Sequence, residues 1–504
     1  MKNFTTIAVS IVFISTILFS LPVDITNTDY ADTPISNSTG DMVYDGECLW
    51  VSTGNGLSRT CDGGITWETF LPGKSFSAII YGYDRIFAAA SFDTESAGEI
   101  FPVGDGLHWT FIGESISFER LAPWQMTFID DTSFYALLSY DLCIVPTETD
   151  TIMYSANWYG GLSRSKDWGE TWDNISWVYD VSDSGAVNWI VIPEIKDSIK
   201  FFVKYLGYDE LFFAVCADTA VEPPIIFTGT ASGIFVVQDT QFTRVLPDDG
   251  LLGGWCVALA VQYLDTGERI IWAASRSSAS GEGDGICFST DDGITWDTLS
   301  ADTVQTYVDD TLCIEYIPLY VMCWNFDFCG DTAFFACEQG FYRSAGLDLA
   351  EKIDIVDFQT GIELPLDQMI SVEVVGDTVW IGSDFGIAYS TDGCACENFR
   401  VLLHRPQPEE NKTYAFPSPF SPYEHGTVFF VFDNPAKGDV SLSIFDFALD
   451  EFYSSTEYVD AGDKQMIQWD GKDSDGEYPA NGIYHFRITL PDGQELWGKF
   501  AVIR

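Results

Sequence analysis

The amino-acid sequence predicts an all-β chain in which a seven-bladed β-propeller precedes a small immunoglobulin-like β-sandwich. A twelve-residue pattern occurs three times, at 56–67, 161–172 and 285–296, and a unit that recurs in this way indicates a repeat architecture. Aromatic residues make up 15% of the chain, which favours strands because large flat side chains pack well on pleated surfaces. Beyond residue 404 both the pattern and the cysteines end, which indicates a second kind of domain.

Residues 1–23 have the features of a secretory signal peptide. Lys2 gives a minimal positive start, Ile7 to Leu21 form an apolar stretch interrupted only by Ser and Thr, and polar sequence follows from Asp24. We expect cleavage between residues 20 and 31. No later segment approaches the length of a membrane span, so we expect no stable span once the signal is removed.

The charge of the chain limits its partners. Asp and Glu total 76 against 24 Lys and Arg, which gives a formal net charge of −52. Such a chain repels phosphate backbones and anionic lipids, so we expect no nucleic acid and no membrane surface among its partners. The charge is typical of a protein that stays soluble in a salty or extracellular medium.

Two interpretations stay open for the 12 cysteines. Disulfides form in exported proteins, but a cysteine inside an apolar strand also serves as a small buried hydrophobe. The cysteines inside such apolar runs are Cys48, Cys256, Cys313 and Cys337. Cys394 and Cys396 have no matching Cys or His pair at zinc spacing, and the four histidines are scattered, so we expect neither a metal nor a cofactor.

Each repeat follows one template over residues 24–404. A short apolar strand such as Leu49 to Ser52 is followed by a loop, a glycine, a second strand and then the motif Ser/Thr-x-Asp-x-Gly-x-Thr-Trp. The anchoring glycines, three in strong copies and four in weaker ones, are Gly56, Gly98, Gly161, Gly233, Gly285, Gly340 and Gly386. Their spacing of 42 to 72 residues fits a four-stranded blade with variable loops, and blades that stack in a closed ring bury one another's faces.

The aspartate of the motif is predicted to be structural rather than catalytic. Asp62, Asp167 and Asp291 can accept hydrogen bonds from backbone N–H groups in a tight turn, while the following glycine permits the backbone geometry. The tryptophan is expected to plug the space between strands.

This motif resembles the Asp box, or BNR repeat, of sialidases, sortilin-type receptors, xyloglucanases and photosystem II assembly-factor-like propellers. The opening Leu49 to Leu57 also resembles the periplasmic sensor propellers of two-component regulators. The resemblance implies that the aspartate turn joins the two outer strands of a blade, away from the usual ligand face.

A polar linker is predicted at 405–411, and a β-sandwich at 412–504. Its expected strands are Thr427 to Phe432, Val440 to Phe445, Gln465 to Trp469, Gly482 to Leu490 and Glu495 to Ile503. The acidic loop from Asp470 to Gly476 has Gly471 and Gly482 where a calcium loop needs ligands, so a turn is favoured over a calcium site.

Three stretches of this module are similar to the C-terminal immunoglobulin-like domain of type IX secretion cargo and of flagellar hook-cap proteins. They are Phe416 to Pro422, Trp469 to Asp473 and Pro479 to Tyr484, with Ser418 where an asparagine is usual. The similarity implies that residues 412–504 contact a secretion machinery, and that the chain is secreted or displayed on a bacterial cell surface.

The ligand is expected at the loops that follow each apolar strand, near one end of the central channel. The candidate residues in these loops are Trp158, Tyr159, Arg276, Asp284, Asp384 and Phe385. We favour non-enzymatic binding of an extracellular glycan or protein. The alternative is a glycoside hydrolase that uses two facing carboxylates from these loops. A sialidase is disfavoured, because it needs several arginines around the substrate carboxylate and only Arg276 lies there.

Overall fold

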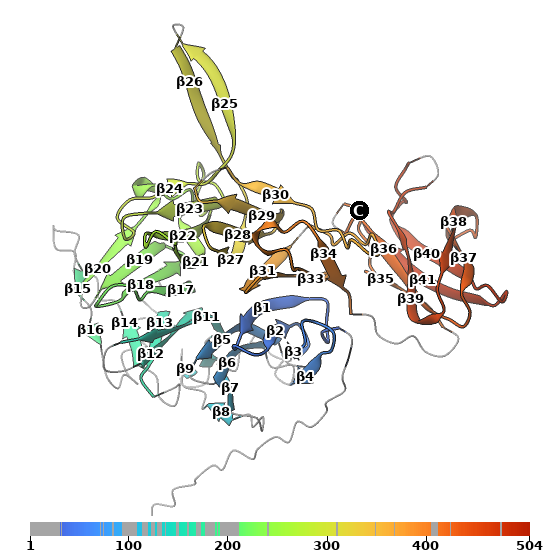
Figure 1. The fold of residues 1–504 in the computed structure, drawn as a ribbon, viewed down its shortest axis with the longest axis horizontal. Helices are drawn as coiled ribbons and strands as arrows, with labels where there is room; N and C mark the ends of the chain where they lie inside the picture. The colour runs from blue at the N-terminus through green and yellow to red at the C-terminus, as the bar shows by residue number, and fades with distance from the viewer. Residues whose placement is uncertain are drawn as a thin grey trace, which may run out of the picture.

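The computed structural model describes residues 31–92, short stretches between 108 and 191, and 211–504 apart from 405–411 and gaps of one or two residues. Strands are the main secondary structure of the described residues, whose only helical segments are two short 3₁₀ turns, η3 (Pro247–Asp249) and η4 (Gly393–Ala395). The predicted all-β class is confirmed. Figure 1 shows a ring of sheets that carries a long hairpin and is followed by a separate pair of sheets.

Seven antiparallel sheets follow one another along the described part of the chain before residue 404. The first two contain β1 (Thr39–Tyr44), β2 (Leu49–Thr53), β3 (Gly56–Thr60) and β4 (Glu68–Phe70), and then β5 (Ser75–Gly82), β6 (Arg85–Phe92), β7 (His108–Ile112) and β8 (Glu119–Leu121). The third contains β11 (Leu138–Pro146), β12 (Thr151–Trp158), β13 (Gly161–Ser165), β14 (Asp173–Ser176) and β16 (Ile190–Val191). The fourth contains β17 (Phe212–Asp218), β18 (Ile225–Thr230), β19 (Gly233–Gln238), β20 (Gln241–Val245) and β15 (Val187–Asn188).

The last three sheets of this series have four strands each. They contain β21 (Trp255–Tyr263), β22 (Arg269–Arg276), β23 (Gly285–Ser289) and β24 (Asp297–Thr298), then β27 (Cys323–Cys329), β28 (Thr332–Cys337), β29 (Gly340–Ala345) and β30 (Glu351–Ile353), and finally β31 (Met369–Val375), β32 (Thr378–Ser383), β33 (Gly386–Ser390) and β34 (Phe399–Leu402). Two further hairpins are β9 (Met126–Phe128) with β10 (Phe134–Ala136), and β25 (Ser300–Val308) with β26 (Thr311–Pro318).

The first strand of each sheet contacts the first strand of the next. The contacts run from β1 to β5, β11, β17, β21, β27 and β31, and β31 contacts β1 again. This closed ring of sheets is a β-propeller. Neighbouring sheets cover both faces of the second strand in a sheet. All residues of β2 and β18 are buried. Burial on both faces explains why these strands are unbroken apolar runs.

In six sheets the anchoring glycine begins the strand that follows the apolar strand, as the template predicts. This strand is the third of its sheet. At Gly233, φ is +94° and an added Cβ would lie 2.1 Å from the carbonyl oxygen of Val245, so only glycine fits there. The second sheet corrects the prediction. Its third strand begins at His108 instead of following Gly98, which itself lies outside the described residues.

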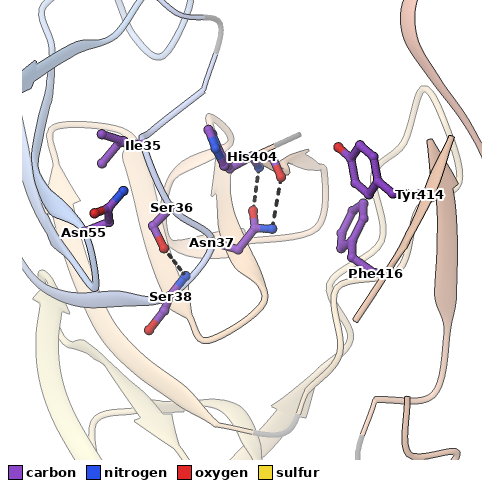
Figure 2. A pocket seen from close by; sticks show the side chains of 8 residues that line it. All are labelled: Ile35, Ser36, Asn37, Ser38, Asn55, His404, Tyr414 and Phe416. Carbon is purple, nitrogen blue, oxygen red and sulfur yellow. Dashed lines mark hydrogen bonds between the residues drawn. The ribbon is translucent and has the colours of Figure 1, made fainter. Parts of the chain in front are cut away.

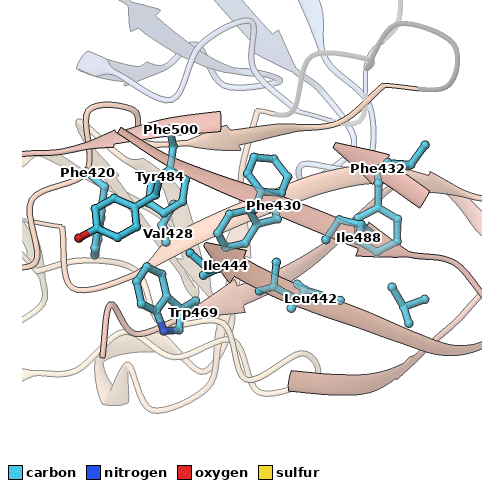
Figure 3. Close-up of a cluster of buried hydrophobic side chains, with 14 of the residues drawn as sticks. Phe420, Val428, Phe430, Phe432, Leu442, Ile444, Trp469, Tyr484, Ile488 and Phe500 are labelled. Carbon is cyan, nitrogen blue, oxygen red and sulfur yellow. The ribbon is translucent and has the colours of Figure 1, made fainter. Parts of the chain in front are cut away.

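The C-terminal module consists of two packed sheets. One contains β35 (Tyr414–Phe416), β36 (Val428–Asn434) and β39 (Gly462–Trp469), and the other contains β38 (Glu451–Val459), β37 (Gly438–Phe445), β40 (Gly482–Thr489) and β41 (Glu495–Val502). Five predicted strands are present, while β35 and β38 escaped the sequence pattern. Figure 3 shows the aromatic core between the sheets, in which Phe430 lies 4.6 Å from Phe486 between ring centroids. The residues that β36 and β37 contribute to this core alternate along each strand. The opposite face of β36 is buried as well.

The module packs against the end of the propeller. Phe429 of β36 belongs to the same buried cluster as Phe399 and Val401 of β34, and Phe416 and Met466 lie against that cluster. The predicted linker at 405–411 lies outside the described residues.

Candidate ligand-binding site

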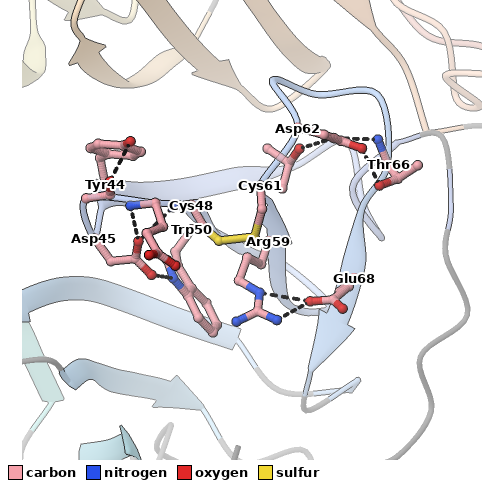
Figure 4. The surroundings of a disulfide bond; sticks show 12 residues. Tyr44, Asp45, Cys48, Trp50, Arg59, Cys61, Asp62, Thr66 and Glu68 are labelled. Atoms are coloured by element: carbon pink, nitrogen blue, oxygen red, sulfur yellow. Dashed lines mark hydrogen bonds and ion pairs between the residues drawn. A yellow bond between two sulfur atoms is a disulfide. The ribbon is translucent and has the colours of Figure 1, made fainter. Parts of the chain in front are cut away.

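The aspartates of the repeated motif cap turns. The Asp62 carboxylate accepts hydrogen bonds from the Thr66 backbone N–H at 2.9 Å and the Thr66 hydroxyl at 2.6 Å (Figure 4). Asp291 makes the same pair with Thr295, at 2.8 and 2.6 Å. The hydrogen bond from the Thr295 hydroxyl, followed by that from its backbone, lowers the pKa of Asp291. These contacts agree with the predicted structural role and leave little basicity for catalysis.

The tryptophan of the motif packs between sheets, which corrects the expectation that it fills a space between strands. Trp67 is fully buried, and its ring meets Trp380 of β32 edge-on at 6.1 Å. A Cβ on Gly64 would lie 2.8 Å from the same Trp380 ring, at a φ of +89°. Trp296 likewise shares a buried cluster with Phe227 of the preceding sheet. The turns that carry Trp67 and Trp296 therefore fasten their own sheets to the preceding sheets.

Two disulfides resolve part of the cysteine question. Cys48 pairs with Cys61, beside the first aspartate turn (Figure 4), and Cys329 pairs with Cys394 across two sheets. Of the two open interpretations, the disulfide is correct for Cys48, which lies at a Cα distance of 4.2 Å from Cys61. The buried thiol is correct for Cys256 and Cys337, which are free and buried. The side chain of Cys313 lies outside the described part of the chain.

Carboxylates also connect neighbouring inner strands around the channel, which the sequence did not predict. Asp41 of β1 accepts the Ile79 N–H of β5 at 2.9 Å, and Asp141 of β11 accepts the Val215 N–H of β17 at 2.8 Å. Asp327 of β27 and Glu373 of β31 make equivalent bonds to Val374 of β31 and Tyr44 of β1. These carboxylates stabilise the ring by joining one sheet to the next.

The inner carboxylates have strongly shifted pKa values. Burial is the largest cause, and it raises the pKa of Asp41 to about 6 and that of Asp141 to about 7. Burial likewise raises the pKa of Asp327 to about 7, and the pKa of Glu373 rises through burial and repulsion from Asp327. Among the described residues, no group of three or more His, Cys, Asp or Glu is arranged to hold a metal ion.

The predicted ligand-face residues of the fifth sheet stabilise their own loop. Arg276 lies 5.7 Å from the ring centroid of Trp255, and Asp284 accepts the Ser277 N–H at 2.7 Å. Glu282, in the same loop, accepts the Ser278 and Gly254 N–H groups. These carboxylates therefore act as loop caps, as the aspartates of the motif do.

Two other predicted residues lie where the propeller meets the C-terminal module. Asp384 accepts the Ser38 hydroxyl at 2.9 Å, and the half-buried Phe385 ring lies 5.3 Å from His425 of the module. Trp158 ends β12, but its side chain and all of Tyr159 lie outside the described residues.

An open cavity of about 400 Å³ lies at this junction (Figure 2). It is lined by the N-terminal segment, the loop after β2, the end of the propeller and β35. The lining residues are Ile35, Ser36, Asn37, Ser38, Asn55, His404, Tyr414 and Phe416. We call it the junction pocket. Among these residues, only Asn55 belongs to one of the loops where the sequence predicts the ligand. The other lining residues come from segments that are far apart in the chain.

Hydrogen bonds fix the walls of the junction pocket. The Asn37 side-chain amide accepts the His404 N–H and donates to the His404 carbonyl oxygen at 3.1 Å. These bonds join two segments that are 367 residues apart in the chain. Asn55 accepts the Gly73 N–H at 3.1 Å. Burial lowers the pKa of His404, so its imidazole is neutral at neutral pH.

The chemistry of the junction pocket is neutral and polar. Amides, hydroxyls and a neutral imidazole offer hydrogen-bond donors and acceptors, while Tyr414 and Phe416, with rings 6.2 Å apart, offer aromatic faces. None of the described residues that line the pocket carries a carboxylate. This described lining suits an uncharged ligand with hydroxyl groups and a C–H face.

Known proteins resemble the chain only distantly. No protein-family model matches it, and no curated protein matches its sequence. PorZ, an essential bacterial surface component of the type-IX secretion system of Porphyromonas gingivalis, is 13% identical with a TM-score of 0.40 over 91% of this chain, which spans 64% of that one. YCF48 bound to D1 peptide is 11% identical with a TM-score of 0.41, covering 76% of this chain and 97% of that chain. The extracellular domain of a putative hybrid two component system from B. thetaiotaomicron is 12% identical with a TM-score of 0.22, covering 92% and 74%.

Within the described residues, no helix has the length and hydropathy that a membrane span requires.

Proposed function

We propose that the chain is a secreted or cell-surface β-propeller that binds a glycan or protein ligand without chemical turnover. A neutral glycan in the junction pocket is the ligand that we favour. The observation that carries this proposal is the described lining of the pocket, where neutral hydrogen-bonding groups lie beside the rings of Tyr414 and Phe416. Pockets of this size commonly bind small molecules, and a few polar groups fix the orientation of the ligand.

In this proposal each of the seven sheets is one Asp-box blade, and residues 412–504 form an immunoglobulin-like sorting domain for a type IX-like route. Support comes from the pairing of the proline-rich segment with the last strand. The Phe420 N–H donates to the Ala501 carbonyl oxygen at 2.7 Å, and the Ile503 N–H donates to the Phe420 carbonyl oxygen at 2.9 Å. The proline-rich stretch that resembles secretion cargo is therefore fixed to the last strand of the module.

A glycoside hydrolase is the second candidate function. It would need two carboxyl groups facing each other across a cleft, about 5 to 10 Å apart. In the described loops, Glu282, Asp284 and Asp384 instead accept hydrogen bonds from nearby backbone N–H or hydroxyl groups. This engagement favours binding over hydrolysis.

A glycan array combined with parallel hydrolysis assays on polysaccharides tests the two functions together. The proposal predicts retention of one class of neutral glycan and no release of reducing sugar. Release of product from any bound polysaccharide would support the hydrolase instead. Export is tested by expressing the full chain in matched bacteria with an intact or disabled type IX system. Protease-accessible protein on intact cells is expected only in the former.

A further inference from the structure

The hairpin β25–β26 is a prominent feature of the fold that takes no part in the junction pocket. It follows β24 of the fifth sheet and precedes β27 of the sixth, and it projects far from the ring (Figure 1). Its base is held by the Leu319 N–H, which donates to the Leu299 carbonyl oxygen at 2.8 Å, and by the Ala350 N–H, which donates to Ser300 at 2.8 Å. Among the described strands, β25 and β26 pair only with each other.

A projecting two-stranded hairpin is costly unless something covers it. Isolated hairpins are marginally stable in water, and long unpaired strand edges attract further strands. This hairpin also exposes large apolar side chains. Ile314 is 49% exposed and Tyr316 is 63% exposed, and because side chains alternate along a strand these two lie on the same face. Val304 and Ile317 are exposed as well.

Charge identifies the kind of partner. The hairpin sequence contains Asp302, Asp309, Asp310 and Glu315, and no Lys or Arg occurs anywhere between Arg276 and Arg343. A second copy of this acidic chain would be repelled. A membrane is disfavoured because the two residues between the paired Val308 and Thr311 are both aspartates. The complement of this surface is a protein strand that carries both apolar and basic side chains.

We propose that β26 adds an extended segment of a basic partner protein to its free edge. The apolar side chains of the added strand cover Ile314 and Tyr316, and the acidic sequence of the hairpin favours a strand that also carries basic side chains. Main-chain pairing of this kind gives affinity, and the alternating side chains give selectivity.

The test uses the full mature chain and a fluorescein-labelled, N-acetylated peptide of eight residues that alternates lysine and valine. A control peptide has proline in place of every second valine, which keeps the charge but removes N–H donors. We expect fluorescence anisotropy to show binding of the first peptide and at least tenfold weaker binding of the second.

Matched variants locate the binding. Ile314→Ser with Tyr316→Ser is expected to weaken binding at least tenfold. Ile483→Ser with Tyr458→Ser changes side chains of similar exposure, 48% and 67%, in the C-terminal module and should leave binding unchanged. Circular dichroism checks that both variants fold. A third variant, Asp302→Lys, should weaken binding through charge alone.

Four results would overturn the proposal. The wild-type chain does not bind the alternating peptide, or both double variants bind it equally well. The proline peptide binds as tightly as the first peptide, which indicates attraction by net charge only. Sedimentation shows a dimer that the Ile314→Ser, Tyr316→Ser variant loses, which makes a second copy the occupant.

Discussion

Between pH 5 and pH 8 we expect the propeller to lose stability as the pH rises, because its inner carboxyl groups ionise inside the ring. The pKa of Asp141 is raised by burial to about 7, from an ordinary value of 3.8. The folded state therefore holds this proton in a range where the unfolded state has released it. Stability is greatest below the unfolded pKa and is lost as the pH rises through the folded pKa.

The magnitude follows from the size of the shift. For one group with a folded pKa of about 7, the loss between pH 5 and pH 8 is at most about 2.7 kcal/mol, since one pKa unit corresponds to about 1.4 kcal/mol. We therefore expect a loss of about 1 to 2.7 kcal/mol from Asp141. Asp41 and Asp327, with pKa values of about 6 and 7, contribute in the same direction.

Urea unfolding followed by tryptophan fluorescence at pH 5, 6, 7 and 8 measures this dependence. The Asp141→Asn variant should show a flatter dependence than the wild type, by about 1 to 2.7 kcal/mol over the range. Asp284→Asn is the matched control, because Asp284 caps an exterior loop, and its pH dependence should equal that of the wild type. Equal slopes for Asp141→Asn and the wild type would refute the reasoning.

Two further predictions concern how the sheets are held together. Trp67→Ala empties a fully buried site between the first and seventh sheets, so it should cost about 3 to 5 kcal/mol and lower Tm by roughly 4 to 6 °C in differential scanning calorimetry. Trp497→Ala, at a half-exposed site in the module, should lower Tm by less than about 3 °C, and equal losses would contradict the role of Trp67. Cys329→Ser opens a disulfide that closes a loop of 65 residues and should cost roughly 2 to 4 kcal/mol. Non-reducing peptide mapping of the wild type should recover Cys329 linked to Cys394, and recovery of either as a free thiol would rule out this pairing.

Local requirements of the backbone were readable from the sequence. Gly233, Gly285, Gly340 and Gly386 occupy positions where an added Cβ would clash, so glycine recurs at these places. The turns at Asp62 and Asp291 could be predicted because each carboxylate accepts its hydrogen bonds from donors within four residues of the chain. The prediction was wrong for the second sheet, because the template placed the start of its third strand at Gly98 and this strand begins at His108.

Contacts between distant segments could not be read in the same way. Asn37 and His404 are 367 residues apart, and nothing in their local sequence indicates that they form one wall of a pocket. The inner carboxylates have only a weak signature in the sequence, namely a single acid between apolar residues, as in Tyr140-Asp141-Leu142. The pairing of Cys48 with Cys61 depends on the path of a turn, which cysteine spacing alone does not define.

The most direct test of the proposed function is a calorimetric titration with the neutral glycan that the array selects. This glycan is titrated into the wild-type chain, into the Tyr414→Ser variant of the junction pocket and into the Tyr423→Ser variant of the exposed surface of the module. Loss of an aromatic face should raise Kd about tenfold for Tyr414→Ser, equivalent to about 1.4 kcal/mol, while Tyr423→Ser binds like the wild type. Equal affinity of all three proteins would contradict glycan binding in the junction pocket.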